Sequence, residues 1–357
     1  MRVRTPAAAL ASVALAAVAL LLPAAPAAAA DGVDRPLDDP RITESSGLGV
    51  SPQHDGVLWT HDDSGNDPVL YALAPDGHVA GTVTLSGVPD VDWEAMAAYR
   101  DGTGRAVLAV ADIGDNRAAR DRVEIDVVAE PARLARTTAP PLLRLRLTYP
   151  DGPRDAEALL VDTVRRRVFV VSKGLFGGDV YVVPAEVWDG TAPRVPTVRS
   201  GRLVRVGTVP LGLVTDGTVA PGGVVLLRTY VQVAAFAPFP LEPGDADLAP
   251  LATDRLPLQR QGEGLALAPD GRSVLLSSEG LGQPVLRVVL PTSVRDVLSA
   301  SAVPPAAPTP RPTTGRRAEA RPGSSPSREQ GGLPWGAVAL AGGVVLLVVA
   351  GLTRARR

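Results

Sequence analysis

The chain has 357 residues, a formal net charge of −2 at pH 7 and no cysteine. A charge so close to zero gives no electrostatic reason to expect a nucleic-acid partner. The lack of cysteine excludes disulfides and thiolate metal sites, although it does not exclude export. The 36 Gly and 35 Pro residues are typical of many short strands joined by turns, together with a Pro-rich linker.

The first thirty residues have the three parts of a secretory signal peptide. Arg2 and Arg4 form a basic start, residues 7–22 are apolar, and residues 23–30 offer small side chains for cleavage. We therefore expect residues 1–30 to be removed on export. An uncleaved signal anchor is the alternative.

The C-terminal residues predict a membrane anchor. Residues 333–353 form an uncharged apolar run, long enough to cross a bilayer as a helix of roughly 30 Å. The basic tail 354–357 follows, and the positive-inside rule keeps it in the cytoplasm. Residues 299–332 are rich in Pro, Ala, Ser and Thr, which predicts a disordered stalk. The expected partners are thus the cytoplasmic membrane and an unidentified extracellular ligand or protein.

Residues 36–298 carry a repeat in which an acid precedes a small residue and an apolar one. The intervals are close to the ~40–50 residues of a four-stranded propeller blade, with room for loop insertions. Five acids mark the repeats: Glu44, Glu94, Glu157, Asp216 and Glu263. The sequence therefore predicts an all-β protein, a β-propeller of five four-stranded blades. A sixth blade would need extra strands within the longest repeats.

Each repeat continues with an apolar second strand, an alternating third strand and a more polar fourth strand. The fifth repeat has no fourth strand, so we expect residues 36–43 to supply it and close the ring. No long amphipathic helix is evident in this region, and only residues 294–298 suggest a helical turn. A doubly wound α/β fold would need crossover helices at regular intervals.

The first strand of a propeller blade lines the central channel, so the five repeat acids should form a ring at one mouth of it. Carboxylates that lie close together repel one another and raise each other's pKa unless something compensates. The ends of the second strands bring further polar residues to the same mouth: His61, Asp62, Asp63, Asp112, Asp115, Lys173, Arg228 and Glu279.

Two hypotheses explain how the repulsion between the ring carboxylates is compensated. In the first, Lys173 and Arg228 pair with ring carboxylates and join neighbouring blades. In the second, the acids hold a divalent cation, of which Ca²⁺ fits best because oxygen ligands abound and His and Cys are scarce. The candidate cation ligands are Glu44, Glu94, Asp112, Glu157, Asp216 and Glu263. No catalytic residue is assigned by these patterns.

Several of these motifs together resemble those of exported actinobacterial proteins described as WD40-like or β-propeller repeat proteins. The resemblance covers about residues 41–290 and implies a propeller domain outside the membrane. It implies no activity and no catalytic residues. The motifs that carry it are Glu44-Ser45-Ser46-Gly47-Leu48, Leu58-Trp59-Thr60-His61-Asp62-Asp63-Ser64-Gly65, Asp92-Trp93-Glu94, Asp112-Ile113-Gly114-Asp115-Asn116, Asp155-Ala156-Glu157-Ala158-Leu159 and Gln261-Gly262-Glu263.

The resulting expectation is a membrane-anchored extracellular propeller that acts as a binding or interaction module at its acidic mouth. One alternative is a Ca²⁺-dependent hydrolase of the lactonase or phosphoesterase type, in which the cation polarises a substrate oxygen. Another is a structural protein of the cell envelope. Metal binding and turnover separate the three.

Overall fold

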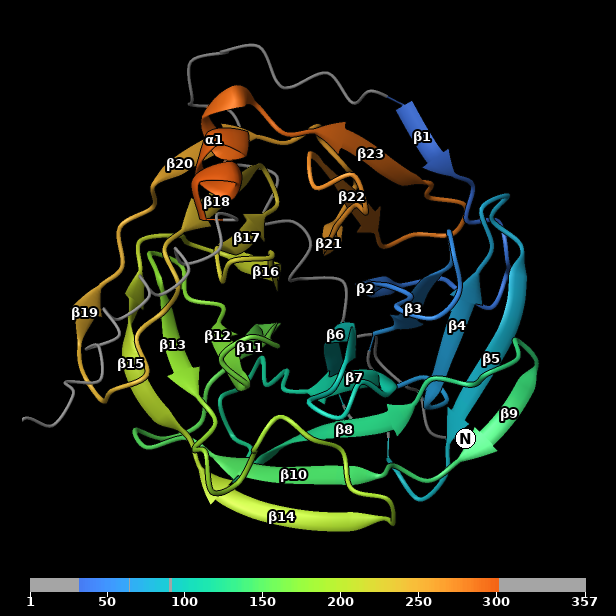
Figure 1. Cartoon of the computed structure of the whole chain (residues 1–357). Coiled ribbons are helices and arrows are strands. Elements are labelled where there is room, and N and C mark those ends of the chain that lie inside the picture. The colour runs from blue at the N-terminus through green and yellow to red at the C-terminus, as the bar shows by residue number, and fades with distance from the viewer. Residues whose placement is uncertain (1–31, 64, 90–91, 302–357) are drawn as a thin grey trace, which may run out of the picture. The chain divides into compact units, whose positions relative to one another are not determined.

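A computed structural model describes residues 32–63, 65–89 and 92–301. Within them, five sheets are arranged around a central axis, each with four antiparallel strands, which confirms the five-bladed β-propeller (Figure 1). The predicted signal peptide, the stalk beyond Ser301, the membrane helix and the basic tail lie outside the described residues. Between residues 32 and 301, apart from the gaps at 64 and 90–91, no helix is long and apolar enough to cross a membrane.

The blades follow one another along the chain, and each begins at the central axis. Blade 1 consists of β2 (Ser45–Val50), β3 (Leu58–Asp62), β4 (Val69–Leu73) and β5 (Val79–Leu85). Blade 2 consists of β6 (Trp93–Arg100), β7 (Ala106–Asp112), β8 (Val123–Ala129) and β10 (Leu143–Thr148). Blade 3 consists of β11 (Ala156–Asp162), β12 (Arg167–Ser172), β13 (Gly178–Val182) and β15 (Val204–Val209). Blade 4 consists of β16 (Val214–Val219), β17 (Val225–Thr229), β18 (Gln232–Phe236) and β20 (Ala252–Arg255). Blade 5 consists of β21 (Gly262–Leu267), β22 (Ser273–Ser278), β23 (Val285–Val289) and β1 (Gly32–Arg35).

The ring is closed by the start of the described chain. β1 pairs antiparallel with β23 and supplies the fourth strand of blade 5. The expected closing strand, residues 36–43, was placed too late in the sequence. These residues instead run from the rim toward the axis and bury Leu37 and Ile42, which are each 1% exposed.

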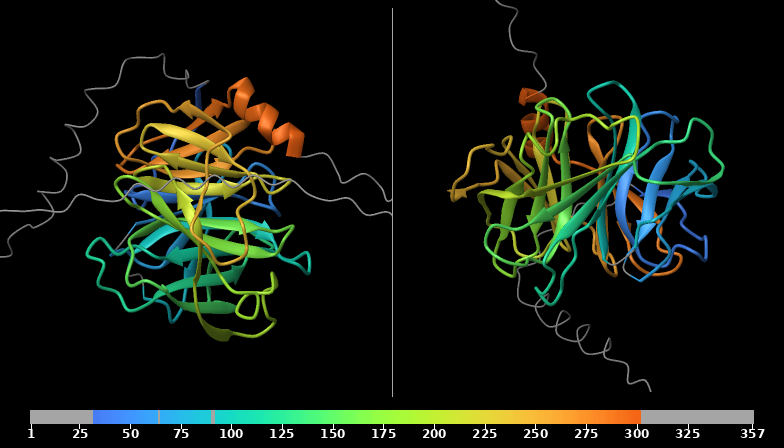
Figure 2. Two further views of the ribbon diagram at one scale, coloured as in Figure 1. Left: turned by 90° about the vertical axis from the view of Figure 1, so that its left-hand side faces the viewer. Right: turned by 90° about the horizontal axis from the view of Figure 1, so that it is seen from below.

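The longest repeats contain no sixth blade, because their extra residues extend neighbouring sheets. In blades 2, 3 and 4, the connection between the third and fourth strands adds a short parallel strand to the preceding blade. β9 (Arg136–Ala139) pairs with β5, β14 (Thr197–Arg202) pairs with β10, and β19 (Ala246–Asp247) pairs with β15. These strands lie on the outer edges of blades 1 to 3 (Figures 1 and 2).

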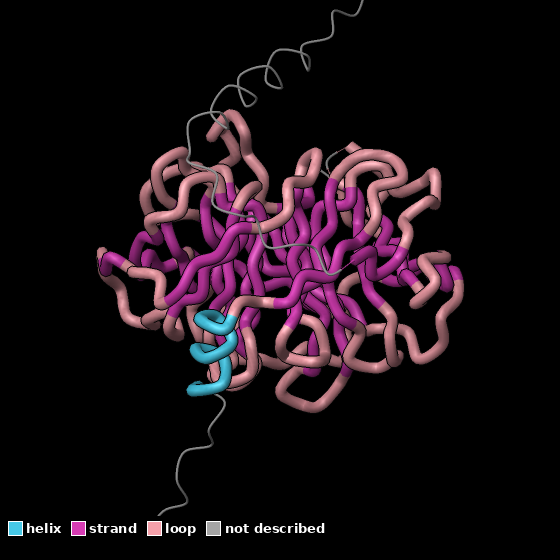
Figure 3. Tube along the Cα trace, turned by 90° about the horizontal axis from the view of Figure 1, so that it is seen from above, coloured by secondary structure: helices cyan, strands magenta, loops and turns pink. Residues whose placement is uncertain are grey.

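The hydrophobic core lies between the blades. Most residues of the second and third strands are buried because both faces of these strands are covered by neighbouring sheets. β7, for example, is buried at every position. Trp59 and Trp93 are 0% and 1% exposed, as expected for residues that pack blade against blade. The turn expected at residues 294–298 is part of α1 (Thr292–Ser301), which buries Val294 and Leu298 at the rim (Figure 3).

Candidate cation and ligand site at the channel mouth

A break in strand pairing places the acidic side chains at the start of each inner strand. In all five blades the register between the first and second strands shifts at this point, which is the signature of a β-bulge. Glu94 and Glu157 each lie at such a shift, and Glu263 lies at the one in blade 5. Ser46 and Thr215 occupy the corresponding positions in blades 1 and 4.

The other two predicted ring acids lie beside this position. Asp216 follows Thr215 and is fully buried, where its carboxylate accepts hydrogen bonds from the Leu265 N–H at 2.6 Å and the Gly217 N–H at 2.7 Å. Its carboxylate therefore ties blade 4 to blade 5. Burial raises the pKa of Asp216 well above its ordinary value.

Glu44 belongs to an outer layer of polar residues, two positions before the bulge. The carbonyl oxygens of this layer accept hydrogen bonds from residues that follow the second strands: Asp63 N–H to Glu44, Gly114 N–H to Asp92, Lys173 N–H to Asp155 and Glu279 N–H to Gln261. Asp92 and Asp155 were not among the predicted site residues. Their signal is the repeated Asp-x-Glu spacing in Asp92-Trp93-Glu94 and Asp155-Ala156-Glu157.

Five carboxyl groups come together here: Glu94 and Glu157 at the bulges, Asp92 and Asp155 in the outer layer, and Asp63 in the loop after β3. One oxygen from each of Asp63, Asp92 and Glu94 lies within 4.8 Å of the others, and the same holds for Glu94, Asp155 and Glu157. Glu94 is common to both groups. Of the six predicted cation ligands, Glu94 and Glu157 therefore belong to the two groups. Such hard oxygen ligands suit Ca²⁺ or Mg²⁺.

Gly114 makes room for these carboxylates. A Cβ atom at this position would collide with Glu94 Oε1 and with the Asp92 carboxylate. The loop Asp112–Asn116 must therefore carry glycine here for reasons of space, whatever its turn conformation requires.

Burial and mutual repulsion make these acids hold their protons. Burial, followed by the charge of Glu157, raises the pKa of Glu94 and Glu263 well above the ordinary value. The pKa of Glu157 rises to about 7, chiefly through burial and despite Lys173. Burial also raises the pKa of Glu279 to about 7, with Asp63 and Glu44 adding to the effect. A bound cation would relieve this repulsion.

Lys173 supplies part of the compensation, as the first hypothesis predicted. Its Nζ lies 2.6 Å from Glu157 Oε1 and 5.5 Å from the centre of the Tyr230 ring. Burial alone would lower the pKa of Lys173, but the charges of Glu157 and Glu263 outweigh burial and raise it. Lys173 therefore stays charged at the mouth.

Arg228 plays a different part from the one predicted. It is fully buried, and its guanidinium donates to Gly264 O at 2.8 Å, Ser277 O at 3.3 Å and Gln259 Oε1 at 3.1 Å. It thus joins blades 4 and 5 mainly through backbone carbonyls. Burial lowers its pKa to about 10, while Glu263 and Asp216 oppose this shift.

The remaining predicted residues hold the mouth loops in place. Asp62 accepts hydrogen bonds from the Thr43 and Glu44 N–H groups, each at 3.0 Å. Asp112 pairs with Arg120 at 2.7 Å, and Asp115 accepts from the Ala119 and Arg120 N–H groups. His61 is buried against Trp93 and donates through Nδ1 to Asp62 O, and burial lowers its pKa to about 4. His61 is therefore neutral at physiological pH.

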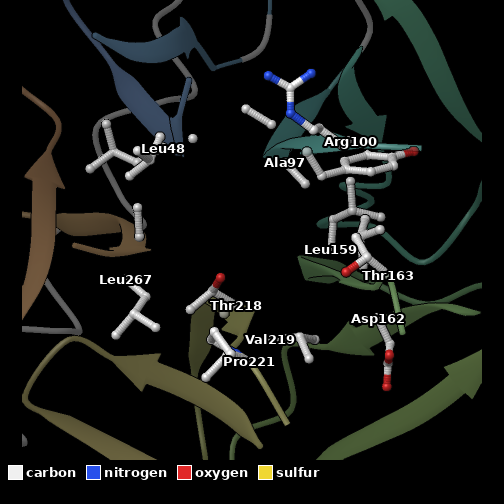
Figure 4. A pocket seen from close by; sticks show the side chains of 18 of the residues that line it. Leu48, Ala97, Arg100, Leu159, Asp162, Thr163, Thr218, Val219, Pro221 and Leu267 are labelled. Atoms are coloured by element: carbon white, nitrogen blue, oxygen red, sulfur yellow. The ribbon is translucent and has the colours of Figure 1, made fainter. Parts of the chain in front are cut away.

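The opposite end of the channel is apolar. A cavity of about 550 Å³ lies there, walled by the second halves of the five inner strands. Its sides include Leu48, Leu159, Val219 and Leu267, while Thr218 turns its hydroxyl toward the space (Figure 4). Arg100 at its edge donates to Pro52 O and Gly104 O, so its charge is satisfied by backbone.

These features define a five-bladed propeller with an acidic mouth. No family model and no curated protein matches the chain. Among solved structures, it is similar to a glutaminyl cyclase from Myxococcus xanthus, with 12% identity, a TM-score of 0.42, and coverage of 72% of this chain and 97% of the other. It is also similar to a luciferin-regenerating enzyme, with 10% identity, a TM-score of 0.40, and coverage of 72% and 96%. A third is the gluconolactonase XC5397 from Xanthomonas campestris, with 17% identity, a TM-score of 0.37, and coverage of 76% and 99%. Values this low carry no argument about function.

Proposed function

We propose that this protein is a binding module whose acidic mouth holds a divalent cation, with Ca²⁺ the best fit. The supporting observation is that the carboxyl groups form two sets of three, and that Glu94 belongs to both sets. Buried carboxylates without a cationic partner are costly. Lys173 pairs with Glu157 at salt-bridge distance. A cation beside Glu94, the residue common to both sets, would offset the buried charge there, and its open coordination positions would accept oxygen atoms of a ligand.

We also propose that the propeller is displayed outside the cell on the C-terminal membrane helix. The support is the sequence of the two chain ends: the basic and apolar residues 1–30, and the uncharged run 333–353 before the arginines of the tail. Fractionation of cells expressing the full chain, followed by protease treatment of intact cells, tests this. A propeller that stays in the soluble cytoplasmic fraction would overturn it.

Calcium binding is tested by thermal unfolding of the full chain in EDTA and then with added Ca²⁺. A ligand that binds only the folded state at about 100 times its Kd adds roughly 2.7 kcal/mol to the free energy of unfolding. Glu94→Gln should abolish this gain because it removes a ligand from both groups. Glu186→Gln, at an exposed position outside the mouth, is the matched control. No gain in the wild type with Ca²⁺, Mg²⁺ or Mn²⁺ would refute the cation site.

The second candidate is a cation-dependent hydrolase acting on a lactone or a phosphoester. The observation that favours it is that the pKa of Glu279 is about 7, which suits a general base near neutral pH. Hydrolysis of γ-lactones and p-nitrophenyl phosphate with Ca²⁺ tests it, with Glu279→Gln as the informative variant. If the protein binds the cation but shows no turnover, the result supports the binding module. If it shows neither cation binding nor turnover, the result supports a structural protein of the cell envelope.

A further inference from the structure

Large apolar side chains are exposed around part of the mouth. Inner strands begin at the mouth and second strands end there, so the loops after the second strands and the connections between blades lie at this face. Among the described residues, five exposed apolar side chains belong to these segments: Leu175 (72% exposed), Phe176 (95%), Val231 (40%), Leu258 (80%) and Leu281 (60%). We call these five residues the apolar rim. Exposed apolar side chains that gather at one place mark interaction sites more often than singly scattered ones.

Backbone contacts show that the segments of the apolar rim are neighbours. Gly174 O accepts from the Leu213 N–H at 2.7 Å, which fixes the Leu175–Phe176 loop on the connection to blade 4. Lys173 at the base of that loop lies over the ring of Tyr230, beside Val231. The Leu256 N–H donates to Val231 O, which brings the segment containing Leu258 alongside. That segment ends at Gln261, whose carbonyl accepts from the Glu279 N–H near Leu281. The segments that carry the apolar rim are therefore neighbours over blades 3, 4 and 5.

The other side of the mouth is polar. The corresponding loops of blades 1 and 2 carry Asp63, Asn66, Asp67, Asp115 and Asp121. The inner edge of the apolar rim is also acidic, because Glu263 and Glu279 lie within blade 5. A buried oxygen of Glu263, Oε2, has no hydrogen-bond partner. A ligand seated on the rim would thus meet apolar contacts on one side and the carboxyl groups of Glu263 and Glu279 on the other.

Charge decides between the kinds of surface that such a rim could bind. A membrane surface is unsuited, because a flat lipid surface cannot reach carboxyl groups as recessed as that of Glu263, which is 2% exposed. A polypeptide is suited, since several separate side chains can reach the successive apolar positions while one basic side chain enters the mouth. Opposite charges at the centre and apolar contacts at the edge would fix the register of such a segment.

We propose that the mouth binds a polypeptide segment in which a lysine or arginine is flanked by large apolar side chains. The basic group lies against Glu263 and Glu279, and its apolar neighbours contact the apolar rim. This inference rests on the proposed role of the mouth as a binding face, and it names the class of partner. It does not require the cation, which is held on the side of blades 1 to 3 by Asp63, Asp92, Glu94, Asp155 and Glu157.

The test is selection of a random dodecapeptide library, displayed on phage, against the detergent-solubilised full chain. Enriched peptides are expected to carry a basic residue next to large apolar residues. Their affinity should fall about tenfold or more in the double variant Leu175→Ser and Phe176→Ser, since this removes the largest apolar contact surface that the rim offers a partner. Glu263→Gln should weaken the same peptides. Leu251→Ser is the matched control, because Leu251 is 57% exposed but pairs with Ala235 at the far end of blade 4.

No enriched peptide, acid-rich peptides, or equal affinity for the rim double variant would each overturn the proposal. Binding of the chain to phosphatidylcholine vesicles through Phe176 in place of peptides would also overturn it. Calcium titration of the rim double variant separates the two proposals. Unchanged calcium binding with lost peptide binding places the partner on the rim, whereas peptide binding without any calcium binding refutes only the cation site.

Discussion

The two ends of the channel are built from the same five inner strands, yet their chemistry is opposite. At the mouth, bulges release residues from regular pairing, and three of the five bulges carry glutamate. At the far end the strands pair regularly, and Leu, Val, Ala and Thr supply most of the lining of a cavity, with Arg100 and Asp162 among its other residues. A channel lined by apolar side chains avoids the free-energy cost of burying polar or charged groups. The acids at the mouth are therefore the part of the channel that stability alone does not explain.

The largest loss in the free energy of unfolding is expected from a substitution of Arg228, which joins the mouth to the core. Arg228→Met leaves Gly264 O and Ser277 O without their donor and Glu263 and Asp216 without a nearby positive charge. Removal of a buried charged partner costs about 3–5 kcal/mol. We expect a loss near the lower limit, measured by urea unfolding, because the acids can take up protons. Arg287→Met, at a partly exposed pair, should cost less than about 1 kcal/mol. Equal losses would mean that the buried network does not stabilise the mouth.

The next effect is on the pH dependence of stability. The pKa values of Glu157 and Glu279 rise from 4.5 to about 7 on folding, so the folded chain retains protons that the unfolded chain has lost. Their contribution is fully present below about pH 4.5 and is lost as the pH rises to about 7. In EDTA, Tm should fall over this interval. Glu157→Gln should flatten the fall, and saturating Ca²⁺ should reverse it above about pH 7. A Tm that rises over this interval would contradict the raised pKa values.

A smaller effect should come from Lys173, which competes with a cation for Glu157. Lys173→Gln removes the contact of 2.6 Å and leaves Glu157 free to bind metal. Calcium affinity should rise about tenfold, which corresponds to about 1.4 kcal/mol. Isothermal titration at about pH 8 measures it. The surface variant Arg166→Gln serves as the control for charge alone. A fall in calcium affinity would show that Lys173 positions Glu157 as a ligand.

The smallest effect is expected from placing an acid at the far end. Thr218→Asp adds one carboxylate to the cavity, where Asp162 is the one other acid among the described lining residues. Because Thr218 is partly exposed, the cost should stay below about 1 kcal/mol, and calcium binding should not change. Thr218→Val is the control for shape. A second calcium site in the titration would show that the two ends differ less than their residues indicate.

Most of the architecture was predictable because each blade repeats two periodic signals. The buried second strands are continuous apolar runs, and the turns before them carry Asp, Gly and Pro. The apolar run Ala106–Ala111, for example, lies within β7, the second strand of blade 2. The closing strand was misplaced because Gly32–Arg35 has no strand-like alternation of its own and is defined by its pairing with Val285–Arg287.

The candidate site was predicted less completely, because its geometry depends on register. From the sequence, Glu44 aligns with Glu94 as the acid before a small and an apolar residue. Strand pairing instead places Ser46 at the bulge and Glu44 in the layer of Asp92 and Asp155. A bulge changes the alignment by one or two residues without a mark in composition. Asp92 and Asp155 became candidates for the cation site only when both layers were placed together.

The short parallel strands β9, β14 and β19 have a consequence for synthesis of the chain. Each comes from the next blade and covers the outer edge of the blade made just before it. α1 packs against the outer strand of blade 4, β20, and β1 is already present when blade 5 is completed. Open strand edges are the sites where nascent chains pair wrongly with one another. A chain emerging from its N-terminus would thus cover each edge in turn, leaving about one blade exposed to its neighbours at any moment.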